Sequence, residues 1–255
     1  MFDVERFHQL RRGKFGSSLQ YFAEIDSTNI FAMELARQRV SEGTVVLADS
    51  QTSGRGRNSH AWYSPAGLNL YFTLVLYPSS ERLHFLPFII SLGIAEELDR
   101  PGLICDLKWP NDILVDERKI AGILIQTAIE ENRLQYAVVG IGINVNTFTF
   151  PKELEATAVS IAQCTGSQLE REPLLAQVLW KIEQSYFMPL KWQELITLVK
   201  EKSSFFDGCR VQIEQQGKII SGTTAGVDPL GGLILETEEG REIFYAGEIQ
   251  SCRKK

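Results

Sequence analysis

The sequence predicts an α+β protein in which helices flank a sheet and a small β-barrel follows. Short runs rich in apolar, β-branched and aromatic residues alternate with stretches of helical periodicity as far as residue 205. From Phe206 onward short strand patterns follow one another, separated by turns that contain glycine. The 255 residues, 44% hydrophobic and 23% charged, are typical of a globular protein with a sizeable core. We therefore divide the chain into a larger domain, 1–205, and a C-terminal domain, 206–255.

The first part of the larger domain is predicted to contain three strands and two helices. The strands are expected at 19–25, 43–49 and 69–76. The first helix follows Asp26 and Ser27, either of which can cap its N-terminus. The second has a long apolar stripe between Pro78 and Leu98, and the following Pro-Gly pair ends it.

The remaining part continues with strands and then becomes helical. Further strands are expected at 103–107, 113–115, 119–125 and 134–143, and residues 153–203 have helical patterns with a break at Pro189. The C-terminal domain shows strand patterns at 209–214, 217–225, 231–236 and 241–247. A barrel of about 50 residues is marginal alone, so we expect it to dock on the larger domain.

The stretch from Gln51 to Arg57 combines residue types that neither a core nor an ordinary turn requires. Gly54 and Gly56 let a ligand approach the backbone closely. Arg55 and Arg57 carry permanent charges whose geometry suits carboxylate or phosphate, and the amide of Gln51 can both donate and accept. The stretch predicts a loop that closes over a small anionic ligand, although taken alone it is equally compatible with a solvated basic turn.

A second polar stretch, Lys108-Trp109-Pro110-Asn111-Asp112, ends one apolar run and opens another. Lys119 follows after a tight polar turn. A strand, a turn and a strand place Lys108, Asp112 and Lys119 near one surface of the sheet. Together with the two arginines, the lysines are the candidates for contacts with a nucleotide.

Two further stretches hold small or polar residues at the ends of predicted elements. Ser27, Thr28 and Asn29 lie where a helix begins, so they either cap the helix only or present N–H groups and hydroxyls to a ligand. Gly140 and Gly142 face the same side of a strand, which indicates either a kink or a surface against which something lies flat. The third glycine of a dinucleotide-binding motif is absent, so that function is not predicted.

The overall composition excludes several classes of function. With 26 Lys and Arg against 32 Asp and Glu, the formal charge is -6, so no general basic field draws the chain to nucleic acid or to a membrane surface. Cysteines and histidines lack metal-binding spacing, and the four cysteines are expected to be thiols in a reducing compartment. The N-terminus lacks the apolar segment of a signal peptide, and no run reaches the ~18 apolar residues of a membrane span. We expect a cytoplasmic protein.

Taken in their order along the chain, these four stretches resemble the motifs of the biotin protein ligase family, and the resemblance runs from about Phe22 to the C-terminus. Enzymes of that family activate biotin as its adenylate and pass it to a lysine of a carboxylase carrier domain. The resemblance implies a class II synthetase-like catalytic domain with a central mixed or antiparallel sheet and an SH3-like C-terminal barrel. It also implies ATP and Mg²⁺ as cofactors, a biotin carboxyl carrier protein as partner, and a monomer or a weak ligand-induced homodimer.

Carried over motif by motif, the resemblance implies a role for each matching residue. Lys119 would be the catalytic cation between the biotin carboxylate and the α-phosphate, with Arg57 on phosphate and Asp112 on metal, nucleotide or the acceptor lysine. Biotin contacts are expected from Ser27, Thr28, Asn29, Gln51, Gly54, Arg55, Gly56, Arg57, Lys119, Gly122, Leu124, Gly140 and Gly142. Nucleotide contacts are expected from Arg57, Trp62, Asn111, Asp112, Lys119 and Asn144. No metal site made by protein side chains alone is expected.

Within these sets, the resemblance assigns parts of the biotin molecule to particular residues. Ser27, Thr28 and Gln51 would hydrogen-bond the ureido ring, which needs matched donors and acceptors once it is buried. The valeryl chain would lie in a slot lined by residues from two strands, namely Gly122, Leu124 and Gly140 to Gly142. Arg55 would cover the bicyclic ring and Trp62 would belong to the loop that orders over the adenylate.

The chain departs from the family pattern in two places. Family members commonly continue Gly-Arg-Gly-Arg with Arg-Gly-Arg, whereas Asn58-Ser59-His60 stand here. Two positive charges are thereby absent or, at His60, dependent on pH, so the resemblance does not fix how tightly the adenylate is retained. Only 26 residues precede Ser27, which favours the short monofunctional form without a DNA-binding domain.

Three rival functions remain compatible with parts of the sequence. Lipoate or octanoate transfer by a related fold is the nearest, although the arginine-rich loop and the small C-terminal domain favour biotin. A biotin sensor without turnover is a second alternative, because of the altered loop at 58–60. A nucleic-acid-binding module is the third, and the acidic balance of charge disfavours it.

Overall fold

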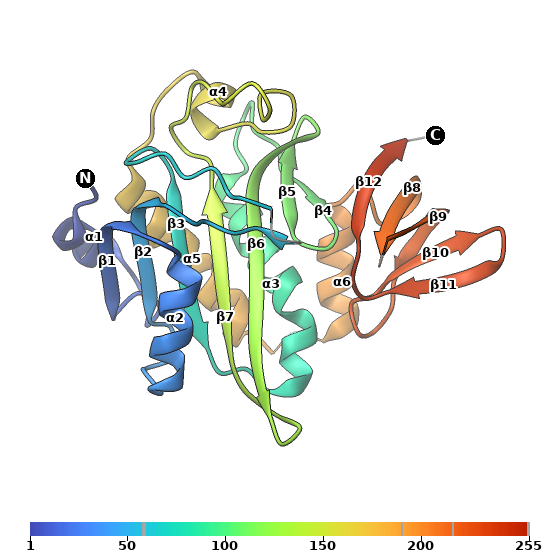
Figure 1. Ribbon diagram of the computed structural model, residues 1–255, viewed down its shortest axis with the longest axis horizontal. Coiled ribbons are helices and arrows are strands. Elements are labelled where there is room, and N and C mark those ends of the chain that lie inside the picture. The colour runs from blue at the N-terminus through green and yellow to red at the C-terminus, as the bar shows by residue number, and fades with distance from the viewer. Residues whose placement is uncertain (58–59, 190, 216, 254–255) are drawn as a thin grey trace.

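The computed structural model describes residues 1–57, 60–189, 191–215 and 217–253. The larger part of the chain is built on a seven-stranded sheet with the order β1-β2-β3-β7-β6-β5-β4 (Figure 1). β1 and β2 run parallel, and every other neighbouring pair is antiparallel. The predicted mixed sheet is therefore confirmed. Its strands are β1 (Leu19–Ile25), β2 (Val45–Gln51), β3 (Leu70–Leu76), β4 (Asp106–Lys108), β5 (Asp112–Val115), β6 (Arg118–Glu130) and β7 (Arg133–Ile143).

Helices cover both faces of this sheet (Figure 1). One face is covered by α2 (Thr28–Arg37), which contacts β2, β3 and β7. The other is covered by α3 (Ser80–Leu98), which contacts β4 to β7 and packs against α5 (Arg171–Phe187). Outside this layer, α1 (Val4–Leu10) packs on α5 and α6 (Trp192–Glu201) packs on α3. A short helix, α4 (Ile161–Thr165), follows the sheet in sequence.

The inner strand β3 is buried throughout because both of its faces are covered. Leu70, Phe72, Leu74 and Leu76 belong to the main core on the α3 side, and Val75 belongs to the smaller core under α2. Such a strand reads in sequence as a continuous apolar run, which is why its position could be predicted. Thr73 interrupts that run with a fully buried hydroxyl, and it faces α2.

The C-terminal sheet differs from the prediction. It has five antiparallel strands in the order β11-β10-β9-β8-β12. The segment predicted as a fourth strand ends early, and the chain then runs back along β8 as a fifth strand. Among the described residues the two outer strands do not pair, so the sheet stays open and the prediction of a closed barrel is wrong. The strands are β8 (Asp207–Gln215), β9 (Lys218–Val227), β10 (Leu233–Thr237), β11 (Gly240–Phe244) and β12 (Glu248–Arg253).

Three smaller details also go beyond or against the prediction. Helix α1 was not predicted; Asp3 caps it by accepting a hydrogen bond from the backbone N–H of Arg6. The helical region begins at Ile161 and not at residue 153. Cys209 is disulfide-bonded, so the expectation of a free thiol is wrong for that residue, whereas Cys105 and Cys164 carry free thiols. Among the described residues, none of the helices combines the length and the apolar character that a membrane crossing requires.

Candidate active site

A cavity of about 140 Å³ lies on the α2 face of the sheet, where segments distant in sequence meet. The start of α2, the loop after β2, the turn between β4 and β5, and strands β6 and β7 all contribute to its wall. All but two of the predicted site residues line it: Ser27, Thr28, Asn29, Gln51, Arg55, Gly56, Arg57, Trp62, Asn111, Asp112, Lys119, Gly122, Leu124, Gly140 and Gly142. The three predicted cations, Arg55, Arg57 and Lys119, therefore share one cavity.

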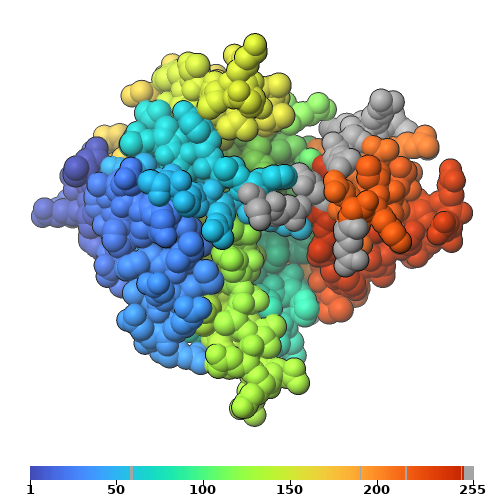
Figure 2. All heavy atoms as spheres, in the orientation of Figure 1, coloured from blue at the N-terminus to red at the C-terminus, as the bar shows by residue number. Residues whose placement is uncertain are grey.

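The loop between β2 and β3 crosses in front of the sheet (Figure 1). Several of its residues line the cavity, so the loop forms a cover over it. In the space-filling view its cyan residues lie between the blue N-terminal region and the red C-terminal sheet (Figure 2). The loop folds back on itself: Arg55 pairs with Ala61, and the Trp62 backbone N–H donates to the carbonyl oxygen of Gly54 at 2.9 Å. A Cβ on Gly54 would lie 2.9 Å from Ser64 Oγ, so this glycine serves the fold of the loop.

The indole ring of Trp62 lies flat over two strand glycines. A Cβ added to Gly142 would lie 2.4 Å from Trp62 Cε2, and one added to Gly122 would lie 2.8 Å from Trp62 Cζ3. The two glycines were expected to make room for the valeryl chain of biotin. In the structure they make room for the Trp62 ring. The Trp62 Nε1–H is buried and has no hydrogen-bond partner among the described residues, so the polar edge of the ring is available to a bound molecule.

Two cations of the cavity, Lys119 and Arg57, contact neighbouring side chains and backbone. Lys119 Nζ lies 2.8 Å from an oxygen of Asp112 and 5.8 Å from the centroid of the Trp62 ring. Arg57 Nη1 donates to Asn111 Oδ1 at 3.3 Å and to the carbonyl oxygen of Gly247 at 3.1 Å. Arg57 therefore connects the covering loop both to the turn after β4 and to the C-terminal part of the chain.

A β-bulge determines which face of the sheet carries Lys119. Gly122 and Leu124 face the cavity, whereas Ile120, Ala121 and Ile123 all belong to the opposite core. The register between β5 and β6 shifts at this point, because Ile113 pairs with Ala121 while Leu114 pairs with Lys119. The extra residue turns Lys119 toward the cavity, where strict alternation would have placed it on the core face.

The backbone of Lys119 is fixed from two sides. Its N–H donates to the carbonyl oxygen of Thr157 at 2.8 Å, and its carbonyl oxygen accepts from the backbone N–H of Val159 at 3.0 Å. Asn144, predicted as a nucleotide ligand, lies outside the cavity lining and donates through Nδ2 to the carbonyl oxygens of Lys119 and Val159. In the structure Asn144 thus supports the strand that carries Lys119.

The helix start contributes a hydroxyl and an amide network. Ser27 is the N-cap of α2, yet its side chain makes no capping bond and lines the cavity. Gln51 Oε1 accepts from the backbone N–H of Thr28 at 2.9 Å and lies 3.1 Å from the hydroxyl oxygen of the same residue. Gln51 Nε2 donates to Ser64 Oγ at 3.3 Å, and Ser64 donates to the carbonyl oxygen of Trp62. The predicted biotin ligand Gln51 is thereby held in one orientation.

Both hydrogen-bonding groups of the Asn29 side chain already have partners within the protein. Its Nδ2 donates to Gln126 Oε1 at 2.9 Å, and its Oδ1 accepts from Thr73 at 2.6 Å. A Cβ on Gly140 would lie 2.1 Å from Asn29 Oδ1. Gly140 consequently leaves room for the Asn29 side chain, as Gly142 does for Trp62.

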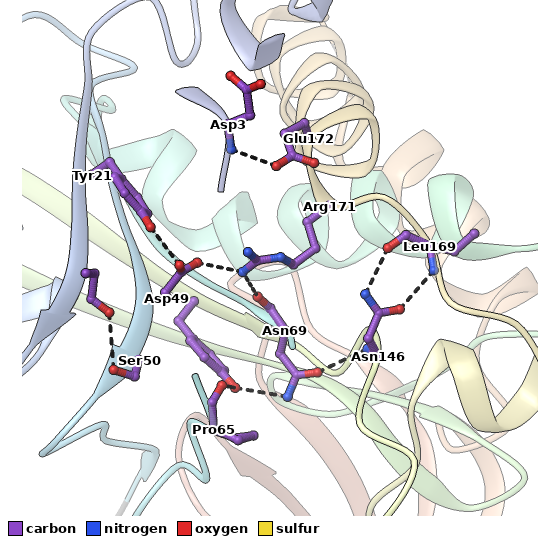
Figure 3. A network of polar contacts seen from close by, with 12 residues as sticks. Asp3, Tyr21, Asp49, Ser50, Pro65, Asn69, Asn146, Leu169, Arg171 and Glu172 are labelled. Carbon is purple, nitrogen blue, oxygen red and sulfur yellow. Dashed lines mark hydrogen bonds and ion pairs between the residues drawn. The ribbon is translucent and has the colours of Figure 1, made fainter. Parts of the chain in front are cut away.

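A buried polar network holds the two ends of the covering loop (Figure 3). Arg171 donates to Asp49 Oδ1 at 2.8 Å and to the carbonyl oxygen of Asn69 at 3.1 Å, and the side chains of this ion pair are only 7% and 9% exposed. Tyr21 donates to the other oxygen of Asp49 at 2.6 Å. Burial, together with this hydrogen bond, raises the pKa of Tyr21 to about 12. Asp49 and Asn69 flank the loop, so the network fixes its starting and end points.

Several residues of the site were missed by the sequence analysis. Ile249, from β12, lines the cavity, and nothing in the sequence indicated that the C-terminal sheet reaches it. Thr73 lies behind the wall, and a polar residue within an apolar run is the signal that could have identified it. Of the altered loop residues, His60 lines the cavity, whereas Asn58 and Ser59 lie outside the described residues.

The described residues contain no group of three or more His, Cys, Asp or Glu side chains close enough to hold a metal ion. Within the cavity wall, Asp112 is the acidic residue, and it is already paired with Lys119. Chemically, the site offers several fixed cations, hydrogen-bonding groups for a neutral polar ring and an apolar floor. Such a site suits a ligand that carries a carboxylate or phosphate beside a small ring.

Comparisons with known proteins agree with this description. The model of the biotin/lipoate A/B protein ligase family matches residues 21–144, and that of the biotin protein ligase C terminal domain matches residues 208–250. The bifunctional ligase/repressor BirA of Bacillus subtilis is 33% identical over 247 residues, which are 92% of this chain and 74% of that protein. The biotin acetyl-CoA-carboxylase ligase of Paracoccus denitrificans is 32% identical over 246 residues, 89% of this chain and 98% of that protein.

Solved structures include the biotin protein ligase from Aquifex aeolicus in complex with biotin and ATP. It is 31% identical to this chain, with a TM-score of 0.76, and the match covers 94% of this chain and 100% of that one. The apo structure of the same Aquifex enzyme matches with a TM-score of 0.75 at 30% identity, over 93% of this chain and 99% of that one.

Proposed function

This chain belongs to the biotin protein ligase family, and we propose that it activates biotin with ATP and transfers it to a lysine of a biotin carboxyl carrier protein. The observation that carries the proposal is the convergence of Arg55, Arg57 and Lys119 on one cavity that also contains Thr28 and Gln51. Fixed cations suit the carboxylate and phosphate groups, while the amide and hydroxyl suit the ureido ring.

In the first step a carboxylate oxygen of biotin attacks the α-phosphorus of ATP, and pyrophosphate leaves. The reacting groups are all anionic, so catalysis depends mainly on positioning and on neutralising charge. Lys119 is proposed to stand between the carboxylate and the α-phosphate, and Arg57 to bind the phosphates. Because Arg57 is also bonded to Asn111, the covering loop and the turn after β4 would close over the nucleotide together.

In the second step the ε-amine of the acceptor lysine attacks the acyl carbon of biotinyl-AMP. The amide bond forms, AMP leaves and one proton is released. Asp112 lies beside Lys119 and is a candidate for contact with metal, nucleotide or the incoming lysine. Trp62 and the rest of the covering loop would exclude water, which otherwise hydrolyses an acyl-adenylate.

Mg²⁺ would be brought by the ATP phosphates and would neutralise part of their charge. The residues present fit this role: Mg²⁺ commonly binds through substrate phosphates and one or two protein carboxylates, and Asp112 is such a carboxylate in the cavity wall. Asn111 is less suitable, because its amide already bonds Arg57 and the carbonyl oxygen of Ile123.

The proposal is tested by incubating the protein with labelled biotin, Mg-ATP and a biotin carboxyl carrier domain, and by following label on the carrier. Transfer to the carrier is expected, and no transfer is expected to a carrier whose acceptor lysine is replaced by arginine. Absence of transfer at saturating substrates would contradict the proposal. If pyrophosphate is also not released although biotin binds, the protein is a biotin sensor instead.

We also propose the division into a catalytic domain, 1–205, and a C-terminal domain, 206–255; the two sheets and the match of the C-terminal family model support it. That model belongs to biotin protein ligases, which favours biotin over lipoate as the substrate. Location in the cytoplasm and a monomer or weak ligand-induced homodimer stay predictions.

A further inference from the structure

Four side-chain oxygens lie in a row along the cavity wall, and one of the two inner members, Thr73, is closed off from the cavity. Asn29 Oδ1 lies 2.6 Å from Thr73 Oγ1, Thr73 Oγ1 lies 2.9 Å from Thr28 Oγ1, and Thr28 Oγ1 lies 3.1 Å from Gln51 Oε1. Thr28 and Gln51 line the cavity, whereas Thr73 is fully buried in β3. The row therefore connects the cavity with a residue that is closed off from it.

Both ends of the row are oxygens that can only accept. Asn29 Nδ2 faces the carbonyl oxygen of Leu124 at 3.4 Å, and a backbone carbonyl cannot donate. Gln51 Oε1 faces the backbone N–H of Thr28 at 2.9 Å, and a backbone N–H cannot accept. The surrounding backbone thus assigns both amide orientations, and each amide presents its oxygen to the row.

The row is short of one hydrogen. It contains three oxygen–oxygen contacts, but only the two threonine hydroxyls supply a hydrogen, one each. In one contact, therefore, lone pairs face each other, which is unfavourable in a buried site. The contact between Thr28 and Gln51 is the one in which both residues line the cavity, so a ligand can supply the missing hydrogen there.

We infer that Thr73 is a specificity-determining residue. By taking the hydrogen of Thr28, it leaves the Thr28–Gln51 contact without one, so the site selects a ligand that places an N–H at this contact. The single hydrogen of Thr73 can serve only one of its two contacts, and Asn29 Oδ1, which can only accept, is the nearer partner. Thr73 Oγ1 is then left to accept the hydrogen of Thr28. The ligand N–H then donates between Thr28 Oγ1 and Gln51 Oε1. The inference rests on the proposed function: the ureido ring of biotin carries two N–H groups, whereas lipoate and octanoate carry none.

The first experiment changes the ligand and leaves the protein unaltered. Equilibrium binding is measured for biotin and for its two cyclic carbamate analogues, in each of which a ring oxygen replaces one ureido N–H. Wild-type protein should bind one of the two isomers at least about tenfold more weakly than biotin, because the oxygen adds a further acceptor to the row. Equal affinity for all three ligands would overturn the inference. This experiment does not depend on the folding of any variant.

The second experiment changes Thr73. Thr73→Val keeps the shape of the side chain but removes its hydroxyl, so Thr28 can donate to Gln51 without competition. This variant should bind biotin about tenfold more weakly and should lose most of the discrimination between the carbamate isomers. Thr73→Ser keeps the hydroxyl and should keep the discrimination. Thr127→Val, at an exposed threonine of β6, is the matched control and should behave as wild type.

The ratio between ligands separates recognition from a general loss of structure. A merely structural role for Thr73 would weaken all three ligands by one factor and leave the ratio unchanged, and that result would overturn the inference. If wild-type protein does not bind biotin, the proposed function fails and the inference fails with it. If wild-type protein binds and transfers biotin but Thr73→Val retains the discrimination, the inference fails alone.

Discussion

At the scale of single residues, the charge of Lys119 is positioned by contacts that leave it close to the cavity. Asp112 lies 2.8 Å away, the Trp62 ring covers one side, and Asn144 and two backbone groups fix the strand behind it. An ion pair of this kind keeps a flexible lysine in one place before substrates arrive. A cation fixed in advance needs little reorganisation when charge moves in the transition state.

Lys119→Ala is expected to slow adenylate formation by about 10²- to 10³-fold, the usual effect of removing one preorganised group. Single-turnover release of pyrophosphate measures the rate, and calorimetry measures biotin affinity. Lys119→Arg is the matched variant that retains the charge and should lose less. If biotin affinity falls while the rate is unchanged, Lys119 serves binding and not chemistry.

Gly142→Val is expected to weaken biotin binding by about tenfold or more, since its side chain would push Trp62 off the strand and occupy the cavity floor. Equilibrium binding of biotin checks this, and a shift of the Trp62 fluorescence to longer wavelength would report exposure of the ring. An unchanged dissociation constant would show that biotin does not use this floor.

At the scale of elements, a turn of the C-terminal sheet docks on the turn after β4. Asp228 Oδ1 accepts from the backbone N–H groups of Leu230 and Gly232, and its other oxygen accepts from Tyr245. The Gly231 carbonyl oxygen, within this turn, accepts from the indole N–H of Trp109 at 3.1 Å. The C-terminal sheet thereby supports the segment that presents Asn111 and Asp112 to the cavity.

Asp228→Ala is expected to destabilise the protein by about 1–3 kcal/mol, because three donors lose their acceptor. It should also raise the KM for ATP, since Trp109 would lose its support. Urea unfolding and steady-state kinetics measure the two effects. Asp228→Asn, which can keep one carbonyl oxygen toward the turn, should be milder. A destabilised variant with an unaltered KM for ATP would show that the turn only holds the domains together.

At the scale of the whole molecule, the buried pair of Arg171 and Asp49 joins four parts of the chain. Arg171 begins α5, Asp49 belongs to β2, Tyr21 belongs to β1, and Asn69 directly precedes β3 (Figure 3). A buried charge is costly unless it is paired, so removing one partner leaves the other uncompensated. The pair therefore couples the stability of the fold to the position of the covering loop.

Arg171→Ala is expected to lower the free energy of unfolding by about 3–5 kcal/mol. Lys181→Ala is the matched control, because its pair with Glu96 spans 3.5 Å and both side chains are more than one-third exposed. That control should change stability by about 0–1 kcal/mol. Urea denaturation of both variants makes the comparison, and equal effects would contradict the role given to the buried pair.

The sequence by itself determined most of the strands and helices and the sets of residues that carry chemistry. Apolar runs and helical periodicity located β1, β3 and α3, because burial on the faces of a sheet or helix imposes those patterns. The motifs identified most of the residues that line the cavity, among them Arg57, Asp112 and Lys119. The fifth C-terminal strand and the contribution of Ile249 were beyond reach, since strand pairing between distant segments leaves no local pattern.

Only the tertiary structure decided which side chains meet. Alternation along β6 would place Lys119 on the core face, and a bulge near Ile120 turns it to the cavity. Gly140 and Gly142 read alike in sequence, yet one accommodates Asn29 and the other Trp62. The physical reason is that local patterns record whether a residue is buried or exposed, whereas the identity of its neighbour depends on strand register and on loops that fold back from elsewhere.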